Sequence, residues 1–337
     1  MMHHRVSRSY WLFIGIIKIS LLTTGAWAQD ATPSTNALTV PSTGNDAKTY
    51  VDFGKANGAR GDLDGAIAAF NEAIKIDPKY ALAYYYRGLA HKLQNKFDDA
   101  VADYTQTIQI NPEYAEAYYE RGSLRGQQGD FDDAISDFSQ VIKLDPKYSP
   151  AYYNLGHVQY FKGNLDAALD GISEALRLAP NFPISYYIRG LVRHAQGHQL
   201  EATSDFQKSL GLGFPDAAFW VWITEMESGE RGLARKDLSD ALGKPDLFKQ
   251  DDWPSQIGGF LLDKITEDQL IAKTKTANQD ESARHLCEAW FYSGMARHFT
   301  GDSKGAQDCF AKAIATGAKG SEELIEASRE AAALKTQ

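Results

Sequence analysis

The chain has 337 residues, of which 43% are hydrophobic and 23% are charged. This composition is ordinary for a globular protein with room for one large domain or two average ones. The formal net charge is −9 at pH 7. An acidic chain argues against nucleic acid or an anionic membrane as its main partner, because both attract basic surfaces.

The first 28 residues have the pattern of a secretory signal peptide. Arg5 and Arg8 precede an apolar stretch at 10–22, and an A-x-A cleavage site ends at Ala28. Lys18 interrupts that stretch, which makes a retained membrane span of ~20 apolar residues a poor fit. Cleavage removes three positive charges and no negative one, so the net charge changes from −9 to −12. We therefore expect a periplasmic or secreted protein, cleaved after Ala28, with no membrane insertion afterwards.

A 34-residue period begins after a Thr-, Ser-, Pro- and Asn-rich stretch at 29–46, which is predicted to be a flexible leader. Five repeats within 47–216 align without gaps: 47–80, 81–114, 115–148, 149–182 and 183–216. Position 8 is always glycine, position 20 is always alanine, and position 24 is aromatic or isoleucine. Apolar residues three and four apart in each half predict two amphipathic helices per repeat. A proline at position 32 or 33 ends the second helix.

This pattern resembles the tetratricopeptide (TPR) repeat, whose small residues at positions 8 and 20 let paired helices approach closely. The resemblance implies an all-α fold, a right-handed solenoid of TPR helix hairpins. Residues 217–286 are predicted to form a degenerate repeat, with Trp220 at position 4, followed by linker helices. A last TPR-like unit is expected at 287–320, and a polar capping helix at 321–337.

Two adjacent tyrosines recur at positions 4 and 5 of four repeats. In a TPR, position 4 is expected to pack between the two helices of its hairpin; it holds Tyr84, Tyr118, Tyr152 and Tyr186. Position 5 lies about 100° further round the helix, towards the concave face that such arrays use for binding. The predicted protein-binding groove contains Tyr85, Leu89, Tyr119, Tyr153, His157, Tyr160, Phe161, Tyr187 and Leu191. The alternative is that neighbouring helices bury these rings.

Arginine stands at position 7 only in repeats that have aspartate at position 23. The predicted pairs are Arg87 with Asp103, Arg121 with Asp137, and Arg189 with Asp205. A charge buried between two helices needs a partner, so the joint occurrence predicts a structural ion pair inside each hairpin. Shared ancestry of the three repeats would leave the same pattern, so the pairing remains a hypothesis.

The two cysteines, Cys287 and Cys309, fall at positions 1 and 23 of the last unit. Position 23 is expected to face position 7, which lies ~9 Å from position 1 along the first helix. A disulfide needs Cα atoms within ~7 Å, so we expect two free thiols.

No residue set with a recognisable chemistry emerges from the sequence. His194 and His198 have the spacing of two metal ligands on a helix, but no third ligand accompanies them. His198 also lies in the predicted turn between two helices. We find no phosphate-binding loop, no zinc-protease motif and no nucleophile with a base. We therefore expect no catalytic residues, no metal and no cofactor.

The segments after the repeats are more characteristic of one protein family than the repeats themselves. They read "FWVWITEMESGERGLARKDL", "DDWPSQIGGFLLDKITEDQL" and "LCEAWFYSGMARHFTGDSKGAQDCFAKAI", in that order. With them, most of 47–320 resembles the NlpI family of periplasmic lipoproteins. The resemblance implies a non-enzymatic, dimeric adaptor that holds cell-wall hydrolases or presents an endopeptidase to a processing protease. No cysteine follows the predicted signal peptide, so we expect a form without the lipid anchor.

Together these observations predict a non-enzymatic periplasmic scaffold that binds protein or peptide partners through its concave groove. The alternative function is a chaperone-like holder or assembly module for exported client proteins. An adaptor would bind one or two partners with saturable affinity, whereas a holder would bind many clients weakly.

Overall fold

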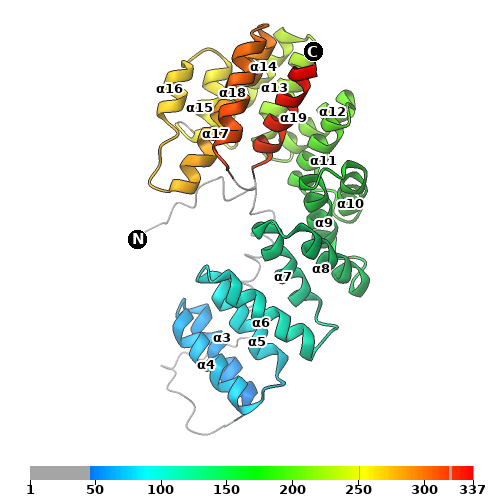
Figure 1. The fold of residues 1–337 in the computed structure, drawn as a ribbon, viewed down its shortest axis with the longest axis vertical. Coiled ribbons are helices and arrows are strands. Elements are labelled where there is room, and N and C mark those ends of the chain that lie inside the picture. The colour runs from blue at the N-terminus through cyan, green and yellow to red at the C-terminus, as the bar shows by residue number, and fades with distance from the viewer. Residues whose placement is uncertain (1–45, 250, 319–320, 337) are drawn as a thin grey trace. The chain divides into compact units, whose positions relative to one another are not determined.

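The computed structural model describes residues 46–249, 251–318 and 321–336. The predicted signal peptide at 1–28, and the leader up to residue 45, lie outside the described residues. The described ranges contain 17 α-helices, α3 to α19, and no strand (Figure 1). The prediction of an all-α fold built from packed helix pairs is confirmed. None of the helices in these ranges has both the length and the apolar content that a membrane crossing requires.

Each of the five predicted repeats contains two helices. Their bounds are α3 Ala47–Ala59, α4 Leu63–Ile76, α5 Ala81–Leu93, α6 Phe97–Ile110, α7 Ala115–Gln128, α8 Phe131–Leu144, α9 Ser149–Phe161, α10 Leu165–Leu178, α11 Pro183–Ala195 and α12 Gln199–Gly211. The N-terminal helix of each repeat is called its first helix, and the C-terminal helix is called its second helix.

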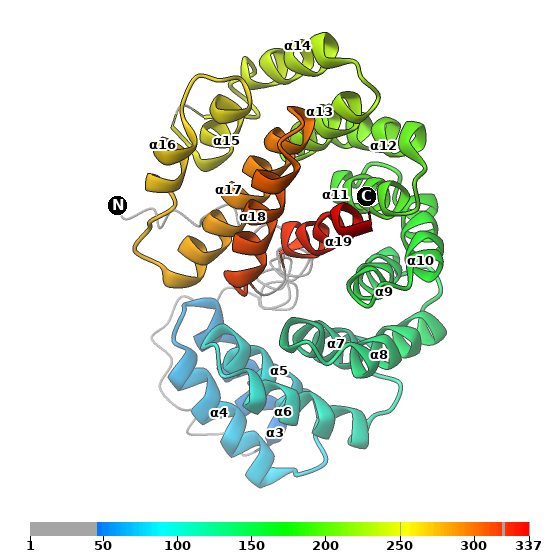
Figure 2. The same cartoon turned by 45° about the horizontal axis from the view of Figure 1, so that its top comes forward.

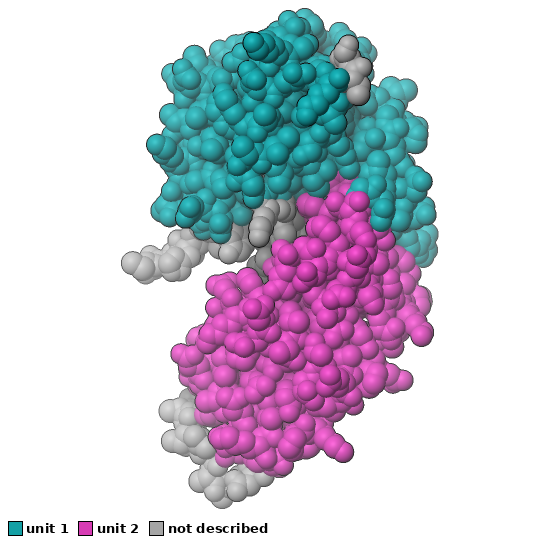
Figure 3. Space-filling model, viewed as in Figure 1, with its two compact units in different colours: residues 1–13, 163–337 teal, residues 14–162 magenta. Residues whose placement is uncertain are grey.

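The helices divide into two compact units, which Figure 3 colours separately. The N-terminal unit ends at Lys162, after α9, and the C-terminal unit begins at Gly163, before α10. The division falls inside the fourth repeat, so its two helices belong to different units.

A residue with left-handed backbone makes the turn between the two helices of a repeat. Gly129 ends α7 with a φ of 90°, and Asn95 takes the equivalent place after α5 with a φ of 60°. Glycine adopts this conformation without steric cost, and asparagine tolerates it better than most residues. In the first repeat the Asp62 carboxylate then accepts the Gly65 N–H at 2.9 Å and caps α4.

Glycine at position 8 lets the two helices of a hairpin touch. A Cβ at Gly190 would lie 2.5 Å from Cε1 of Phe206, and a Cβ at Gly294 would lie 2.4 Å from Cε1 of Phe310. Both phenylalanine side chains are fully buried. The core of a hairpin is therefore a ring of the second helix packed on bare backbone of the first.

Seven further helices complete the C-terminal unit. Their bounds are α13 Ala217–Glu227, α14 Arg231–Leu242, α15 Trp253–Leu261, α16 Glu267–Ala272, α17 Gln279–Phe299, α18 Ser303–Ala315 and α19 Glu322–Thr336. Trp220 of α13 stacks on Phe206 of α12 at 5.5 Å and meets Phe291 of α17 at 5.8 Å. Helix α13 therefore contacts the last hairpin directly, and the short helices α15 and α16 pack on α17.

Candidate interaction surface

The second tyrosine of each pair is a core residue. Tyr85, Tyr119 and Tyr187 each place their ring 5.9 Å from the position-24 ring of their own repeat. An aromatic residue just before the next first helix closes the other side. Tyr114 lies 4.9 Å from Tyr85, and Tyr148 lies 5.3 Å from Tyr119. Each of these rings therefore lies between the second helix of its own repeat and the aromatic residue that precedes the next first helix.

The other residues of the predicted groove share this burial. Phe161 is half-buried, and the remaining eight are buried: Tyr85, Leu89, Tyr119, Tyr153, His157, Tyr160, Tyr187 and Leu191. The prediction of an exposed tyrosine ladder is therefore wrong, and the alternative of rings buried by their neighbours holds. The physical reason is that position 5 faces the second helix of its own repeat and the aromatic entry residue of the next.

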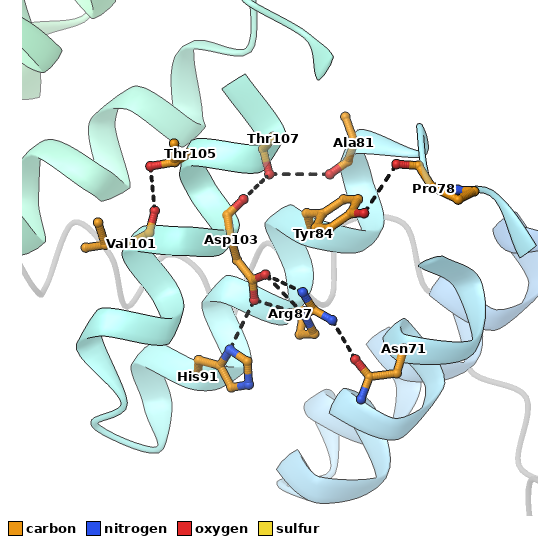
Figure 4. A network of polar contacts seen from close by, with 10 residues as sticks. All are labelled: Asn71, Pro78, Ala81, Tyr84, Arg87, His91, Val101, Asp103, Thr105 and Thr107. Carbon is orange, nitrogen blue, oxygen red and sulfur yellow. Dashed lines mark hydrogen bonds and ion pairs between the residues drawn. The ribbon is translucent and has the colours of Figure 1, made fainter. Parts of the chain in front are cut away.

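The first tyrosine of each pair is half-buried, and in three of the four pairs it ties its helix to the preceding loop. The Tyr84 hydroxyl donates to the Pro78 carbonyl at 3.3 Å (Figure 4), and Tyr152 and Tyr186 make the same bond six residues back. The guanidinium of Arg87 lies over the Tyr84 ring, 5.4 Å from its centre. These tyrosines are structural, as predicted, but they clamp a loop rather than fill the space between two helices.

All three predicted ion pairs are present: Arg87 with Asp103, Arg121 with Asp137, and Arg189 with Asp205. Each arginine donates from both Nε and Nη2 to the carboxylate, as Figure 4 shows for Arg87. The aspartates are between 2% and 4% exposed. Each carboxylate is therefore removed from water with a guanidinium against it, which offsets the cost of burial.

Each of these aspartates has a second basic partner that the sequence analysis did not single out. Nδ1 of His91 lies 3.0 Å from Oδ2 of Asp103, and Arg125 and Arg193 occupy the same place in their repeats at 2.8 Å and 2.6 Å. All three stand at position 11, one helical turn after the arginine. These second partners could have been identified from the sequence, because the same three repeats have a basic residue at both position 7 and position 11.

The same arginines connect neighbouring repeats. Nη1 of Arg87 donates to Asn71 Oδ1 at 2.6 Å, and Nη1 of Arg121 donates to Thr105 Oγ1 at 3.0 Å. A second row joins the end of a first helix to the start of the preceding second helix, through Gln94 to Asp64, Gln128 to Asp98, Lys162 to Asp132, and Gln196 to Asp166. The acids that begin the second helices thus bind the next repeat as well as meeting the helix dipole.

Neighbouring first helices are also linked to each other. In the N-terminal unit, Lys92 donates to Glu120 at 2.6 Å and Asn154 donates to the Tyr119 hydroxyl oxygen at 3.0 Å. In the C-terminal unit, His194 lies 3.0 Å from a carboxylate oxygen of Glu227 on α13. In each unit the first helices therefore form a continuous layer, which we call the first-helix layer.

The histidines and cysteines that the sequence analysis singled out are not arranged as metal ligands or as a disulfide in the described residues. His194 binds Glu227, whereas His198 is exposed before α12. Among the residues that the structure describes, no three His, Cys, Asp or Glu side chains gather as metal ligands would. Cys287 and Cys309 are free and buried. Burial raises the pKa of Cys287 to about 12, which keeps that thiol protonated.

The C-terminal helix does more than cover the end of the repeats. α19 packs on α17 and α18 and also lies beside α11 of the first-helix layer (Figures 1 and 2). Its acids act electrostatically on Tyr187 and His194 of α11. The sequence predicted a polar cap here, and it did not predict this second contact, which joins residues far apart in the chain.

Comparison with protein families identifies the repeats. The family description "TPR repeat" matches residues 54–95, and "Tetratricopeptide repeat" matches residues 81–114 and 127–187. The chain is a tetratricopeptide-repeat protein. A comparison with curated proteins gives no match.

Solved structures of other TPR proteins resemble part of the chain. The crystal structure of MamA is 29% identical, covers 48% of this chain and 94% of its own, and has a TM-score of 0.47. PilF of Pseudomonas aeruginosa is 16% identical, covers 62% and 95%, and has a TM-score of 0.51. YrrB, described as a TPR protein with an unusual peptide-binding site, is 19% identical, covers 50% and 87%, and has a TM-score of 0.47. These similarities concern the fold alone.

Proposed function

We propose that the chain is a non-enzymatic periplasmic scaffold that binds protein or peptide partners. The observation that carries the proposal is the first-helix layer, in which side chains bond one first helix directly to the next. Stacked repeats use such a surface to bind a partner across several repeats at once. Within each unit, the rows of bonds between repeats hold this surface in one shape, which lowers the entropy lost on binding.

Recognition would use the exposed side chains of this layer, because the paired tyrosines serve the core. Leu93, near the end of α5, is 53% exposed, and Glu116 is exposed in the first turn of α7. Leu93 follows Lys92, which bonds the next first helix. An exposed leucine beside a rigid, charged surface is a suitable anchor for a partner side chain.

The expected partners are envelope proteins, with cell-wall hydrolases and a processing protease as the first to test. The resemblance to the NlpI family supports this choice, and it also supports a homodimer. The full chain would be used to capture partners from envelope extract, beside Leu93→Ser and a matched control, Leu200→Ser. Leu200 is 81% exposed but lies on the second helix α12.

A scaffold should capture one or two proteins with saturable affinity, and Leu93→Ser should weaken capture while Leu200→Ser leaves it unchanged. Weak capture of many unrelated proteins, insensitive to both substitutions, would favour the chaperone-like holder. Light scattering on the purified chain tests the homodimer, and a monomer at all concentrations would contradict it.

The periplasmic location rests on the signal-peptide pattern at 1–28. Fractionation of a producing bacterium should find the chain in the periplasm, and N-terminal sequencing should begin at Gln29. A cytoplasmic chain that retains its first residues would contradict the proposed location without affecting the scaffold function.

A further inference from the structure

Helices α13 and α14 form a hairpin whose turn matches the turns of the repeats (Figure 2). Gly229 has left-handed backbone with a φ of 80°, as Gly129 has with a φ of 90°. In both hairpins the N–H after this residue donates at 2.9 Å to the carbonyl four residues before it. Places in α13 and α14 can therefore be counted from the turn residue, as in the repeats.

The buried faces of the hairpin agree with this count. Ala234 and Leu238, five and nine residues after the turn, are buried like the alanine and the phenylalanine at these places in α8. Phe219, ten residues before the turn, packs on Phe248 at 6.1 Å, as the second tyrosine of a repeat packs on the aromatic entry residue of the next. Both helices therefore present the same places to each other as the helices of a repeat do.

An acid stands in this hairpin where three repeats have a base. Glu225, four residues before the turn, takes the place of Arg125, whose Nη1 lies 2.8 Å from a carboxylate oxygen of Asp137. Asp237, eight residues after the turn, takes the place of Asp137, and Val221 replaces the first arginine. In all three repeats that have an aspartate at this place, two basic residues face it. The α13–α14 hairpin keeps the aspartate and lacks both bases.

The exposure of the two acids reflects the missing bases. Glu225 is 4% exposed, and both of its carboxylate oxygens are buried without a hydrogen bond to any described residue. The Asp237 side chain is 33% exposed, whereas the Asp137 side chain, beneath its two arginines, is 3% exposed. Lys236 lies 3.6 Å from Asp237, but it is exposed and its closer partner is Asp240 at 3.0 Å. The aspartate is therefore open to solvent, and a buried acid without a donor stands at the facing place.

The neighbouring bases of α14 and α17 are bonded to other groups. Arg231 donates to the Phe299 carbonyl at 2.7 Å, Arg235 pairs with Asp263 at 2.7 Å, and Arg297 pairs with Glu267 at 3.1 Å. On α12, Asp205 already has its two arginines. Within the described residues, these bases are therefore committed to other acceptors.

The hairpin offers room and an apolar edge beside the acids. Trp222 is buried at the place where the repeats have glycine, so α13 and α14 cannot approach as closely there as helices that meet at a glycine. Leu233, four residues after the turn, is 40% exposed. At the equivalent place in α8, Asp133 lies 3.7 Å from Arg125. A side chain that took the place of the missing base would therefore lie beside Leu233.

We propose that the slot between Glu225 of α13 and Asp237 of α14 binds an arginine side chain of a protein partner. The guanidinium would donate to both carboxylates, as the chain's own arginines do in the repeats, and apolar atoms of the partner would contact Leu233. Arg125 and Arg193 show that a guanidinium suits this place. This inference rests on the proposed scaffold function and names the side chain that the partner inserts.

Binding at this slot should depend on pH. Burial, and after it the charges of Asp237 and Glu230, raise the pKa of Glu225 to about 7. Below that pH, Glu225 holds a proton that a bound guanidinium must displace. Arginine keeps its charge throughout this range, so binding strengthens as pH rises through about 7.

Two short peptides provide matched probes. The first is Gly-Leu-Arg-Leu-Gly with a labelled N-terminus and an amidated C-terminus, and the second has citrulline, a neutral isostere, in place of the arginine. Binding of each to the full chain would be measured by fluorescence anisotropy. At about pH 8 the arginine peptide should bind at least about tenfold more tightly than the citrulline peptide. It should also bind about tenfold more tightly at about pH 8 than at about pH 6.

Two chain variants separate the slot from the general acidity of the chain. Glu225→Gln should weaken binding of the arginine peptide about tenfold at about pH 8 and remove its dependence on pH. Asp240→Asn also removes one negative charge, from a side chain of α14 that is 64% exposed, and should leave binding unchanged. Equal binding of the two peptides, no binding of either, or an equal effect of the two variants would overturn the proposal.

A third variant tests whether the slot accepts a guanidinium at all. Glu225→Arg supplies the base from the chain itself, so the urea midpoint should rise by about 0.3 M and the arginine peptide should no longer bind. A lower midpoint would overturn the proposal, because the slot would then not fit a guanidinium. If the native chain and Glu225→Gln capture the same envelope partner equally well, the scaffold function stands and this inference fails.

Discussion

Removing Asp137 should destabilise the protein strongly, because it leaves two arginines without their shared partner. The Asp137 side chain is 3% exposed, and it accepts bonds from Arg121 at 2.7 Å and 3.0 Å and from Arg125 at 2.8 Å. Breaking a buried pair by removing one partner costs ~3–5 kcal/mol. Arg125 also lies 3.7 Å from Asp133, which gives it a second acid, so we expect Asp137→Ala near ~3 kcal/mol.

Urea unfolding followed by circular dichroism would measure this loss. The matched control is Asp133→Ala in the same helix, whose side chain is 66% exposed and should contribute less than ~1 kcal/mol. A double variant, Arg121→Phe with Asp137→Ala, copies the first repeat, which has Phe53 and Ala69 at these positions. It should recover part of the loss, because fewer charges remain buried without a partner. A change below ~0.5 kcal/mol for Asp137→Ala would refute the reasoning.

Three further predictions follow from the core. Tyr119→Ala should lower the free energy of unfolding by ~3–5 kcal/mol, measured in urea, and a fully stable variant would mean that the ring is not a core group. Gly294→Ala should cost ~1–3 kcal/mol in the same assay, because its Cβ would meet the Phe310 ring at 2.4 Å; an unchanged midpoint would show that the ring moves freely. Cys287 and Cys309 should react with a thiol reagent in urea but not in the native chain near pH 8, since both are buried. Rapid labelling of the native protein would contradict this.

The sequence by itself determined the helices and their order. A 34-residue period with glycine at position 8 and an aromatic residue or isoleucine at position 24 predicts helix hairpins, and all ten repeat helices start and end within the predicted repeats. The joint presence of arginine and aspartate also identified three ion pairs, because a buried charge requires its partner within reach.

Only the tertiary structure decided which of two adjacent tyrosines is buried. Tyr118 and Tyr119 point about 100° apart around the helix, and the repeat pattern does not fix how the helix is rotated in its hairpin, so it does not decide which ring is buried. The position of α19 could not be read from the sequence either. Its acids look like those of an exposed cap, and they face the first-helix layer only because α11 and α17, far apart in the chain, lie on either side of it.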